Sequence, residues 1–381
     1  MPSLWRDVSK MSKPRKEIIR QLFVEAQSLD VYEVGETTSG LARKLGRKPE
    51  EIIKLNSNEN FFVSLNFLRN VLKESVDKVD PRIYPRDECI ELKQALAKYL
   101  SILPEQIVIG TGSDDLINLV ARMVLKNGDQ ALSILPTFSI YERCVRTAGA
   151  HYMPIPLRED FSLDADRLLE NVSSRTKLIF LCCPNNPTAN KFLRQDIEAL
   201  ANNFDGIVAV DEAYVDFSDD SLVDIVNKYE NLVIFRTFSK VFGLAGLRIG
   251  CAVSNSMLAK IMDEKFQMPY TVTLVAIKAV IKILENIDII KEAIEKVKVQ
   301  RQILIEDLNK IRGVQTFDSE TNFVLFQTYK NSKIVYEKLL SKGVIVRDIG
   351  QVLRYPNCLR VTVAPQPMMD EFLKALKEIL S

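Results

Sequence analysis

The chain of 381 residues is 47% hydrophobic and 27% charged, which is an ordinary balance for a globular protein. It is too long for one small core, so we expect two domains. Its 51 basic and 50 acidic residues leave a formal net charge of +1, so there is no overall electrostatic attraction to nucleic acid or to an anionic membrane.

The numbers and positions of histidine and cysteine limit the kinds of site that the chain can form. His151 is the single histidine, which excludes histidine-based metal sites and Ser-His-Asp hydrolysis, and we expect no metal. The six cysteines lack metal-ligand spacing, and Cys182 and Cys183 are adjacent in an apolar run, which indicates a reduced, cytoplasmic protein. No membrane span is expected, because Lys278 and Lys282 interrupt the apolar run at residues 272–284.

Residues 1–50 are predicted to form an N-terminal arm that joins the smaller domain. A short strand at residues 52–55 then leads into an Asn-rich turn that contains Asn58. Helices follow at residues 67–79 and 88–100. Tyr84 lies between these helices in an extended link, because a residue before proline avoids the helical region.

From residue 107 onward, strand-like runs alternate with helical patterns. Strands are expected at residues 107–109, 131–135, 177–183, 207–210 and 232–235. Alternation of this kind predicts an α/β fold with a mostly parallel sheet covered by helices. We assign residues 51–270 to this large domain.

After residue 270 the pattern changes. A long helix at about residues 286–312 is closed by Gly313, which suits a helix C-cap. Short strands are expected at residues 322–326 and 344–346, followed by a segment that holds residues 359–363 and a final helix from Met369. Together these elements predict a smaller α+β domain at residues 271–381.

Polar side chains follow the predicted strands at their carboxyl ends, where α/β sheets bind ligands. Ser113 lies at a strand-turn-helix junction whose free backbone N–H groups can bind a phosphate. Asp211 follows a purely apolar strand, and a buried carboxylate needs a cationic partner. Lys240 follows another apolar strand, and it combines an amine nucleophile with the phosphate-binding groups of Ser239 and Arg248.

This combination suits pyridoxal 5'-phosphate (PLP), held as a Schiff base on Lys240. A protonated pyridine nitrogen supplies the cation that Asp211 needs, and the ring can then accept the electrons of a substrate carbanion. Tyr214 and Asn186 can hydrogen-bond the phenolic oxygen of the ring, and Phe138 can stack on its face. The residues expected to hold the phosphate are Ser113, Asp114, Ser239 and Arg248.

Each of these features has an ordinary structural interpretation when it is taken alone. Lys240 could simply open an exposed loop, residues 184–188 could be a plain turn, and Asp211 could cap a helix. The ordered set is much harder to obtain by chance, and it is the set that predicts PLP.

The chain resembles the fold type I PLP-dependent enzymes, and among them the class II aminotransferases of the histidinol-phosphate aminotransferase group. The motifs that carry the likeness are KLNSNEN at 54–60, YP at 84–85, GSDD at 112–115, NNPT at 185–188, VDEAY at 210–214, RTFSK at 236–240 and LAGLR at 244–248. The resemblance implies transamination between an amino acid and an oxo acid, with Lys240, Asp211 and Tyr214 as the catalytic residues.

The resemblance also implies roles on the substrate side and across subunits. Tyr84 is expected to reach the cofactor phosphate of the neighbouring subunit, which requires a homodimer. Tyr32 and Asn58 are expected near the substrate. Arg360 is similar to the arginine that binds the amino acid carboxylate, and Arg347 is expected to assist with the phosphate of the other substrate.

The sequence departs from the family pattern at several positions. Phe138 stands where the family usually has tyrosine, which keeps ring stacking and removes a hydroxyl contact. Ala189 replaces the usual glycine of Pro-Thr-Gly, and the Tyr-x-Pro-Gly element reads Tyr32-Glu33-Val34-Gly35. Residues 361–367 lack the usual Gly- and Asn-bearing run.

The expected function is transamination of histidinol phosphate with 2-oxoglutarate in histidine biosynthesis. The alternatives on the same scaffold are an aromatic amino acid aminotransferase and a phospho-threonine decarboxylase. A non-catalytic PLP-binding sensor is disfavoured, because such sensors usually carry a DNA-binding domain for which this chain has no room.

Two arginines favour histidinol phosphate as the substrate over an aromatic amino acid. One arginine suffices for the carboxylate of glutamate, and a second is useful when the alternating substrate carries a dianionic phosphate instead. We expect Arg347 and Arg360 to face one pocket if the runs at residues 344–346 and 361–363 pair as neighbouring strands.

Overall fold

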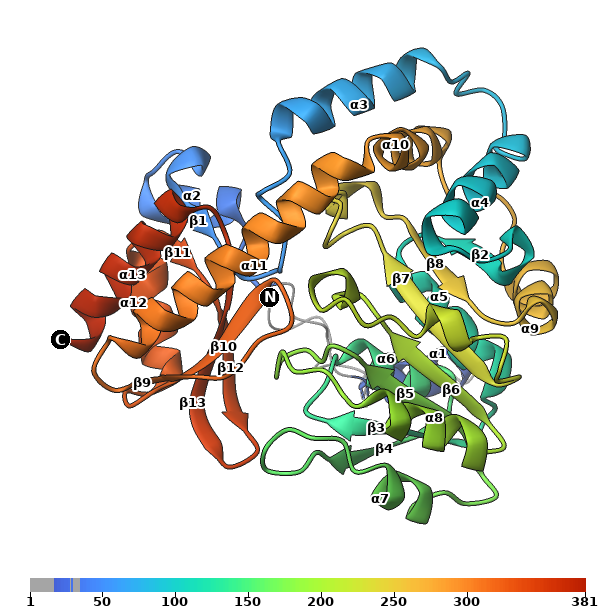
Figure 1. Ribbon diagram of the computed structural model, residues 1–381. Helices are drawn as coiled ribbons and strands as arrows, with labels where there is room; N and C mark the ends of the chain where they lie inside the picture. Colours follow the sequence, from blue (N-terminus) through green and yellow to red (C-terminus); the bar gives the residue numbers. More distant parts are fainter. Residues whose placement is uncertain (1–16, 28, 30–34) are drawn as a thin grey trace.

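The structure is a computed structural model, and it describes residues 17–27, 29 and 35–381 (Figure 1). A mixed sheet covered by helices stands beside a smaller unit of helices and antiparallel strands, so the predicted α/β fold class is confirmed. The predicted substrate residue Tyr32 lies outside the described residues. Within the described part of the chain, no helix is long and apolar enough to cross a membrane.

The larger sheet contains, within the described residues, the strands β2 (Ile107–Gly110), β3 (Gln130–Leu135), β4 (His151–Pro156), β5 (Thr176–Cys182), β6 (Ile207–Asp211), β7 (Leu232–Thr237) and β8 (Gly250–Val253). Their order is β2-β8-β7-β6-β5-β3-β4. β8 pairs antiparallel with β2 and β7, and the other neighbouring pairs of this sheet are parallel, so the sheet is mostly parallel as predicted.

Helices cover both faces of this sheet. The helices of the larger unit are α3 (Leu65–Asp77), α4 (Asp87–Leu100), α5 (Ser113–Val124), α6 (Ile140–Thr147), α7 (Ala165–Glu170), α8 (Arg194–Asn203), α9 (Ser256–Ile261) and α10 (Leu274–Glu285). Side chains alternate along the central strands: Phe180 and Phe235 join a core with α5 and α6, whereas Ile179 and Ile234 join the core on the opposite face. Burial on both faces explains why these strands are almost entirely apolar.

The smaller unit is built on an antiparallel sheet of order β12-β13-β10-β9. Its strands are β9 (Val314–Thr316), β10 (Phe323–Thr328), β12 (Arg347–Val352) and β13 (Tyr355–Thr362). Its helices α11 (Ile287–Asn309), α12 (Ser332–Ser341) and α13 (Gln366–Leu380) pack against one another and against this sheet (Figure 1).

The segment before the large sheet comprises α1 (Glu17–Gln27), α2 (Thr38–Leu45) and β1 (Ile53–Lys54). β1 pairs in parallel with β11 (Val344–Ile345), which ties this segment to the smaller unit. Residues 344–346 and 361–363, whose pairing was the condition for a shared arginine pocket, therefore do not pair with each other. It is β12, the next strand, that pairs with β13.

The helix α10 packs against α3 and α4 of the larger unit, although it follows residue 270. The long helix α11 then leads into the smaller unit (Figure 1). The domain boundaries at residues 50 and 270 stay predictions.

Candidate active site

A cavity lies where the carboxyl ends of β5, β6 and β7 meet the N-terminus of α5, with β12 and β13 of the smaller unit closing one side. It encloses about 520 Å³. Most of the predicted site residues line it, namely Asn58, Ser113, Asp114, Phe138, Asn186, Asp211, Tyr214, Ser239, Lys240, Arg248, Arg347 and Arg360.

One end of the cavity has the features of a phosphate site. The N-cap of α5, Gly112, has no side-chain hydrogen bond, so the first N–H groups of the helix are left for a ligand. Arg248 lies over this helix end, where Nη1 donates to Ser239 Oγ at 3.3 Å. A Cβ on Gly112 would lie 2.8 Å from Arg248 Nη2, so glycine permits this close approach. Helix N–H groups, hydroxyls and a guanidinium therefore converge on one point.

Asp114 takes part in this end of the cavity in a different way from Ser113. Its carboxylate accepts a hydrogen bond from Arg248 Nη2 at 3.0 Å. Because a carboxylate and a phosphate repel each other, the side chain of Asp114 suits the orientation of Arg248, and only its backbone N–H suits the phosphate itself.

Asp211 lies at the floor of the cavity and is 2% exposed. Its Oδ2 accepts from the hydroxyl of Tyr141 at 2.9 Å, and its Oδ1 accepts from the N–H of Ala213 at 3.1 Å. Burial raises the pKa of Asp211 to about 7, with these hydrogen bonds acting in the opposite direction. A carboxylate in this position needs a cation to stay ionised.

Tyr141 is a site residue that the sequence reasoning missed. It is fully buried, stacks on Phe180 at 5.0 Å between centroids and meets Phe138 edge-on at 5.7 Å. Phe138 lies just before α6 and Tyr141 lies in the first turn of this helix, so closeness to Phe138 in the sequence is the signal that points to Tyr141.

Lys240 is held by a backbone group that was also not predicted. Its Nζ donates to the carbonyl oxygen of Ser57 at 2.8 Å and lies 6.0 Å from the centroid of the Tyr214 ring. Burial, and next the positive charge of Arg360, lower the pKa of Lys240 to about 8. The hydroxyl of Tyr214 accepts from Asn58 Nδ2 at 2.9 Å, so Asn58 orients Tyr214 as well as lining the cavity.

Arg347 and Arg360 lie directly opposite each other on the paired strands β12 and β13, and both line the cavity. Arg360 is 8% exposed; its Nη2 donates to the carbonyl oxygen of Asn56 at 2.8 Å, and its Nη1 donates to the amide oxygen of Asn186. The amide NH2 of Asn186 is therefore the group left to face a ligand. The two predicted arginines share a pocket, although through β12 and not through the strand that the sequence indicated.

Tyr84 is the described site residue that the structure does not bring to this cavity. Its side chain is 73% exposed and stacks on Tyr270, with 4.6 Å between ring centroids. Its distance from the other predicted residues is the arrangement that a contact with a second subunit would require.

The residues present fit the predicted cofactor. No described residue forms an ion pair with Asp211, Lys240 offers a buried amine, and the N-terminus of α5 with Arg248 offers a dianion site. In the described part of the chain, no group of three or more His, Cys, Asp or Glu side chains is arranged to hold a metal ion.

Comparison with known proteins agrees with this geometry. The sequence model of the family described as aminotransferase class I and II matches residues 50–376. The chain belongs to this family. Its relatives include the histidinol-phosphate aminotransferase of Thermoanaerobacter sp., which is 37% identical over 328 residues that cover 86% of this chain and 93% of that protein.

Two solved structures also resemble this class I and II aminotransferase. The histidinol-phosphate aminotransferase from Sinorhizobium meliloti in complex with pyridoxal-5'-phosphate has a TM-score of 0.84 at 28% identity, covering 93% of this chain and 96% of that chain. The L-threonine-O-3-phosphate decarboxylase from Porphyromonas gingivalis has a TM-score of 0.74 at 25% identity, covering 86% of this chain and 99% of that chain.

Proposed function

We propose that this protein is a PLP-dependent aminotransferase that exchanges an amino group between histidinol phosphate and 2-oxoglutarate, in histidine biosynthesis. The family and the name of its relatives support the reaction. The observation that supports histidinol phosphate as the substrate is the position of Arg347 opposite Arg360, where both line the cavity of Lys240.

Bound PLP supplies an electron-poor ring that stabilises negative charge at the α-carbon of the substrate. In this chain, Asp211 would keep the pyridine nitrogen cationic, and Tyr141 would keep Asp211 in place. Tyr214 and Asn186 would donate hydrogen bonds to the phenolic oxygen, and Phe138 would cover one face of the ring. The phosphate would be held by Ser113, Ser239, Arg248 and the N-terminus of α5.

Lys240 would attach the cofactor covalently and, when freed, would move the proton at the α-carbon of the substrate. A pKa of about 8 leaves roughly a tenth of the amine neutral at pH 7, and this neutral fraction can accept the proton. A lysine with its ordinary pKa of about 10.4 would be almost fully protonated there. Burial of Lys240 therefore serves the proposed chemistry directly.

The two arginines would serve different parts of the two substrates. Arg360 is buried and held by Asn56 and Asn186, which suits a fixed site for the carboxylate that glutamate presents. Arg347, across the strand pair, would add the second guanidinium that a dianionic phosphate requires. An aromatic amino acid makes no such demand.

The proposal includes a homodimer in the cytoplasm. The exposed Tyr84–Tyr270 pair supports a contact with a second subunit, which would supply Tyr84 to the neighbouring phosphate site. All six cysteines are free, as is typical of proteins in reducing compartments.

A substrate panel tests the function. The holoenzyme is mixed with histidinol phosphate, aromatic amino acids or phospho-threonine, with 2-oxoglutarate as acceptor, and both glutamate and carbon dioxide are measured. We expect glutamate formation to be fastest with histidinol phosphate and to fall at least about 10³-fold in Lys240→Ala, the loss typical of a removed acid–base group.

Two other results of the substrate panel would favour the two alternative functions. Faster turnover of phenylalanine would favour the aromatic aminotransferase. Release of carbon dioxide from phospho-threonine would favour the decarboxylase, whose fold the chain shares.

A further inference from the structure

A buried cluster of charges lies directly behind the active site. Arg236, near the end of β7, is 7% exposed, and its Nη1 and Nη2 contact Glu212 Oε2 at 3.1 Å and Asp216 Oδ1 at 2.6 Å. Tyr99 of α4 donates its hydroxyl to the same oxygen of Asp216 at 2.9 Å. We refer to Arg236, Glu212, Asp216 and Tyr99 as the Arg236 cluster.

None of the four side chains lines the cavity. Successive side chains of a strand point to opposite faces, so Asp211 faces the cavity while Glu212 faces away from it, and Thr237 faces the cavity while Arg236 faces away. The cluster is therefore part of the support of the site.

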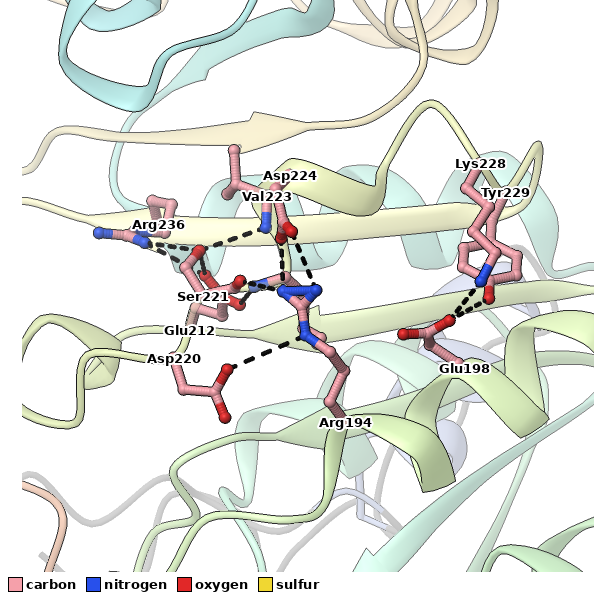
Figure 2. Close-up of polar contacts among 11 residues, drawn as sticks. Arg194, Glu198, Glu212, Asp220, Ser221, Val223, Asp224, Lys228, Tyr229 and Arg236 are labelled. Carbon is pink, nitrogen blue, oxygen red and sulfur yellow. Dashed lines mark hydrogen bonds and ion pairs between the residues drawn. The ribbon is translucent and has the colours of Figure 1, made fainter.

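The carboxylate of Glu212 is also held from outside the cluster. Glu212 accepts from Ser221 Oγ at 2.7 Å and from the N–H of Leu222 at 2.6 Å, as Figure 2 shows in part. Burial by itself would lower the pKa of the Arg236 guanidinium, but the charges of Asp216 and Glu212 outweigh burial and raise it. The guanidinium is a permanent cation with a fixed geometry.

The sequence positions of the cluster explain what it holds. Glu212 directly follows Asp211, Asp216 comes shortly after Tyr214, and Arg236 comes shortly before Lys240. Arg236 thus joins the two segments, residues 211–216 and 236–240, that carry the three proposed catalytic residues. Tyr99 of α4 adds a further connection, because its ring meets Phe242, just after Lys240, edge-on at 5.9 Å.

A contribution to folding stability alone does not explain such a cluster. Taking charges out of water is so unfavourable that apolar residues of similar volume often serve equally well in a core. What a buried, bidentate guanidinium provides is a fixed direction and separation of its partners.

We propose that the Arg236 cluster is a positioning device, which fixes Asp211, Tyr214 and Lys240 relative to one another for proton transfer at the substrate. The proposal rests on the aminotransferase function proposed above. Because a misplacement of about 1 Å can lower a rate on the order of 100-fold, loss of the cluster should act on kcat. It should not act on KM, since Arg347 and Arg360 lie on β12 and β13, which the cluster does not contact.

The central test is a variant that removes the charges together, Arg236→Met/Glu212→Gln/Asp216→Asn, so that no unpaired charge stays buried. We expect a Tm close to that of the wild type, a kcat lower by about 30- to 100-fold, and KM values for both substrates within about 2-fold. Arg236→Lys keeps the positive charge but loses the two-pronged guanidinium, so its kcat should lie between that of the triple variant and that of the wild type. Lys228→Met is the matched control, because Lys228 pairs with Glu198 on the surface near the same sheet (Figure 2) and should change neither constant.

A second readout does not depend on turnover. The acylation rate of Lys240 in the cofactor-free enzyme is followed against pH by peptide mass spectrometry. The wild-type profile should have its midpoint near pH 8. In the triple variant the midpoint should move up, towards the value of about 10.4 for a solvated lysine.

The outcomes separate the possible explanations. A triple variant that folds with wild-type kcat and an unchanged acylation profile would overturn the proposal. If the triple variant does not fold, Arg236→Lys serves as the test. A wild-type kcat and an unchanged acylation profile in Arg236→Lys would then overturn the proposal. If the wild type does not transaminate histidinol phosphate, the proposed function fails while the acylation profile still tests the cluster.

Discussion

Asp211 and Lys240 are buried in the same cavity, and burial moves their pKa values in opposite directions. The pKa of Asp211 is raised to about 7 and that of Lys240 is lowered to about 8, because both groups lose their hydration. Both shifts favour the neutral form in the cofactor-free protein. A bound pyridinium would reverse this for Asp211 by supplying a cation.

The shift of Asp211 predicts a pH dependence of the stability of the cofactor-free enzyme. In the unfolded chain an aspartate titrates near pH 3.9, so between about pH 4 and pH 7 the folded state binds more protons than the unfolded state. Stability is therefore lost as the pH rises through this window. Thermal denaturation at pH 5, 6 and 7 measures this: the Tm of the wild type should fall with rising pH relative to that of Asp211→Asn. If the two Tm values change in parallel with pH, the raised pKa of Asp211 is contradicted.

The two cavity arginines should differ in their effects on the two substrates. We expect Arg347→Ala to lower kcat/KM for histidinol phosphate by a factor that corresponds to about 1.5–3 kcal/mol of lost transition-state stabilisation. The kcat/KM for glutamate should fall far less, because only the phosphate needs the second guanidinium. Arg360→Ala should weaken both. Steady-state kinetics with each substrate measure this.

A control for the arginine variants lies beyond the same strand pair. Arg354, between β12 and β13, is paired with the exposed Glu159 outside the cavity, so Arg354→Ala should leave both substrates unchanged. If Arg347→Ala lowers kcat/KM equally for both substrates, Arg347 does not serve the phosphate of histidinol phosphate specifically.

At the scale of elements, the phosphate end of the cavity depends on how closely β8 approaches the N-terminus of α5. Gly250 begins β8, and a Cβ there would lie 2.8 Å from three backbone atoms, Arg236 O, Gly112 C and Ser113 N. Backbone atoms cannot rotate away as a side chain can. The glycine therefore lets the helix start where its N–H groups face the cavity.

We predict that Gly250→Ala displaces the start of α5. The overpacking should lower the free energy of unfolding by about 1–3 kcal/mol and weaken PLP binding as well. Chemical denaturation and a PLP titration of the cofactor-free enzyme measure the two effects. The control is Gly246→Ala, since nothing lies within 4 Å of a Cβ there. A Gly250→Ala enzyme with unchanged PLP affinity would show that the start of α5 is not needed for binding.

Another element, β12, was missed at the sequence level for a physical reason. Its residues, RDIGQV, are largely polar and include a glycine, and its pairing with β13 contains register shifts near Gly350. Such a strand has no clear alternation of apolar and polar residues. Its neighbour on the chain, β11, is fully buried and therefore gave the stronger signal.

For the whole molecule, the position of Tyr84 outside its own cavity predicts a site shared between subunits. Lys240→Ala and Tyr84→Ala should each be inactive or nearly so. After subunit exchange, an equal mixture should recover about a quarter of wild-type activity, because half of the dimers are mixed and each mixed dimer has one intact site.

A second mixture controls for this recovery. Asp211 and Lys240 line the same cavity of one chain, so Asp211→Ala mixed with Lys240→Ala should recover nothing. If the Tyr84→Ala mixture also recovers nothing, with subunit exchange confirmed by size and mass, Tyr84 acts within its own chain and the shared site is wrong.

The sequence by itself determined the fold class, the mostly parallel sheet and the family, because these follow from local patterns. Apolar runs such as that before Asp211 form strands wherever both faces of a sheet are buried, and short motifs such as RTFSK keep their chemistry in adjacent residues. The predicted residues gathered in one cavity because the carboxyl ends of parallel strands meet at one edge.

Only the tertiary structure decided the contacts between distant segments. The hydrogen bond from Tyr141 to Asp211 and the contact of Lys240 with Ser57 join residues far apart in the chain, and the place of Arg347 opposite Arg360 depends on the register of β12 on β13. Arg236 stands in a motif that the sequence had singled out, yet its role depends on Glu212 and Asp216 of another segment. Such pairings are set by strand register and by packing across the sheet, which no local pattern of residues encodes.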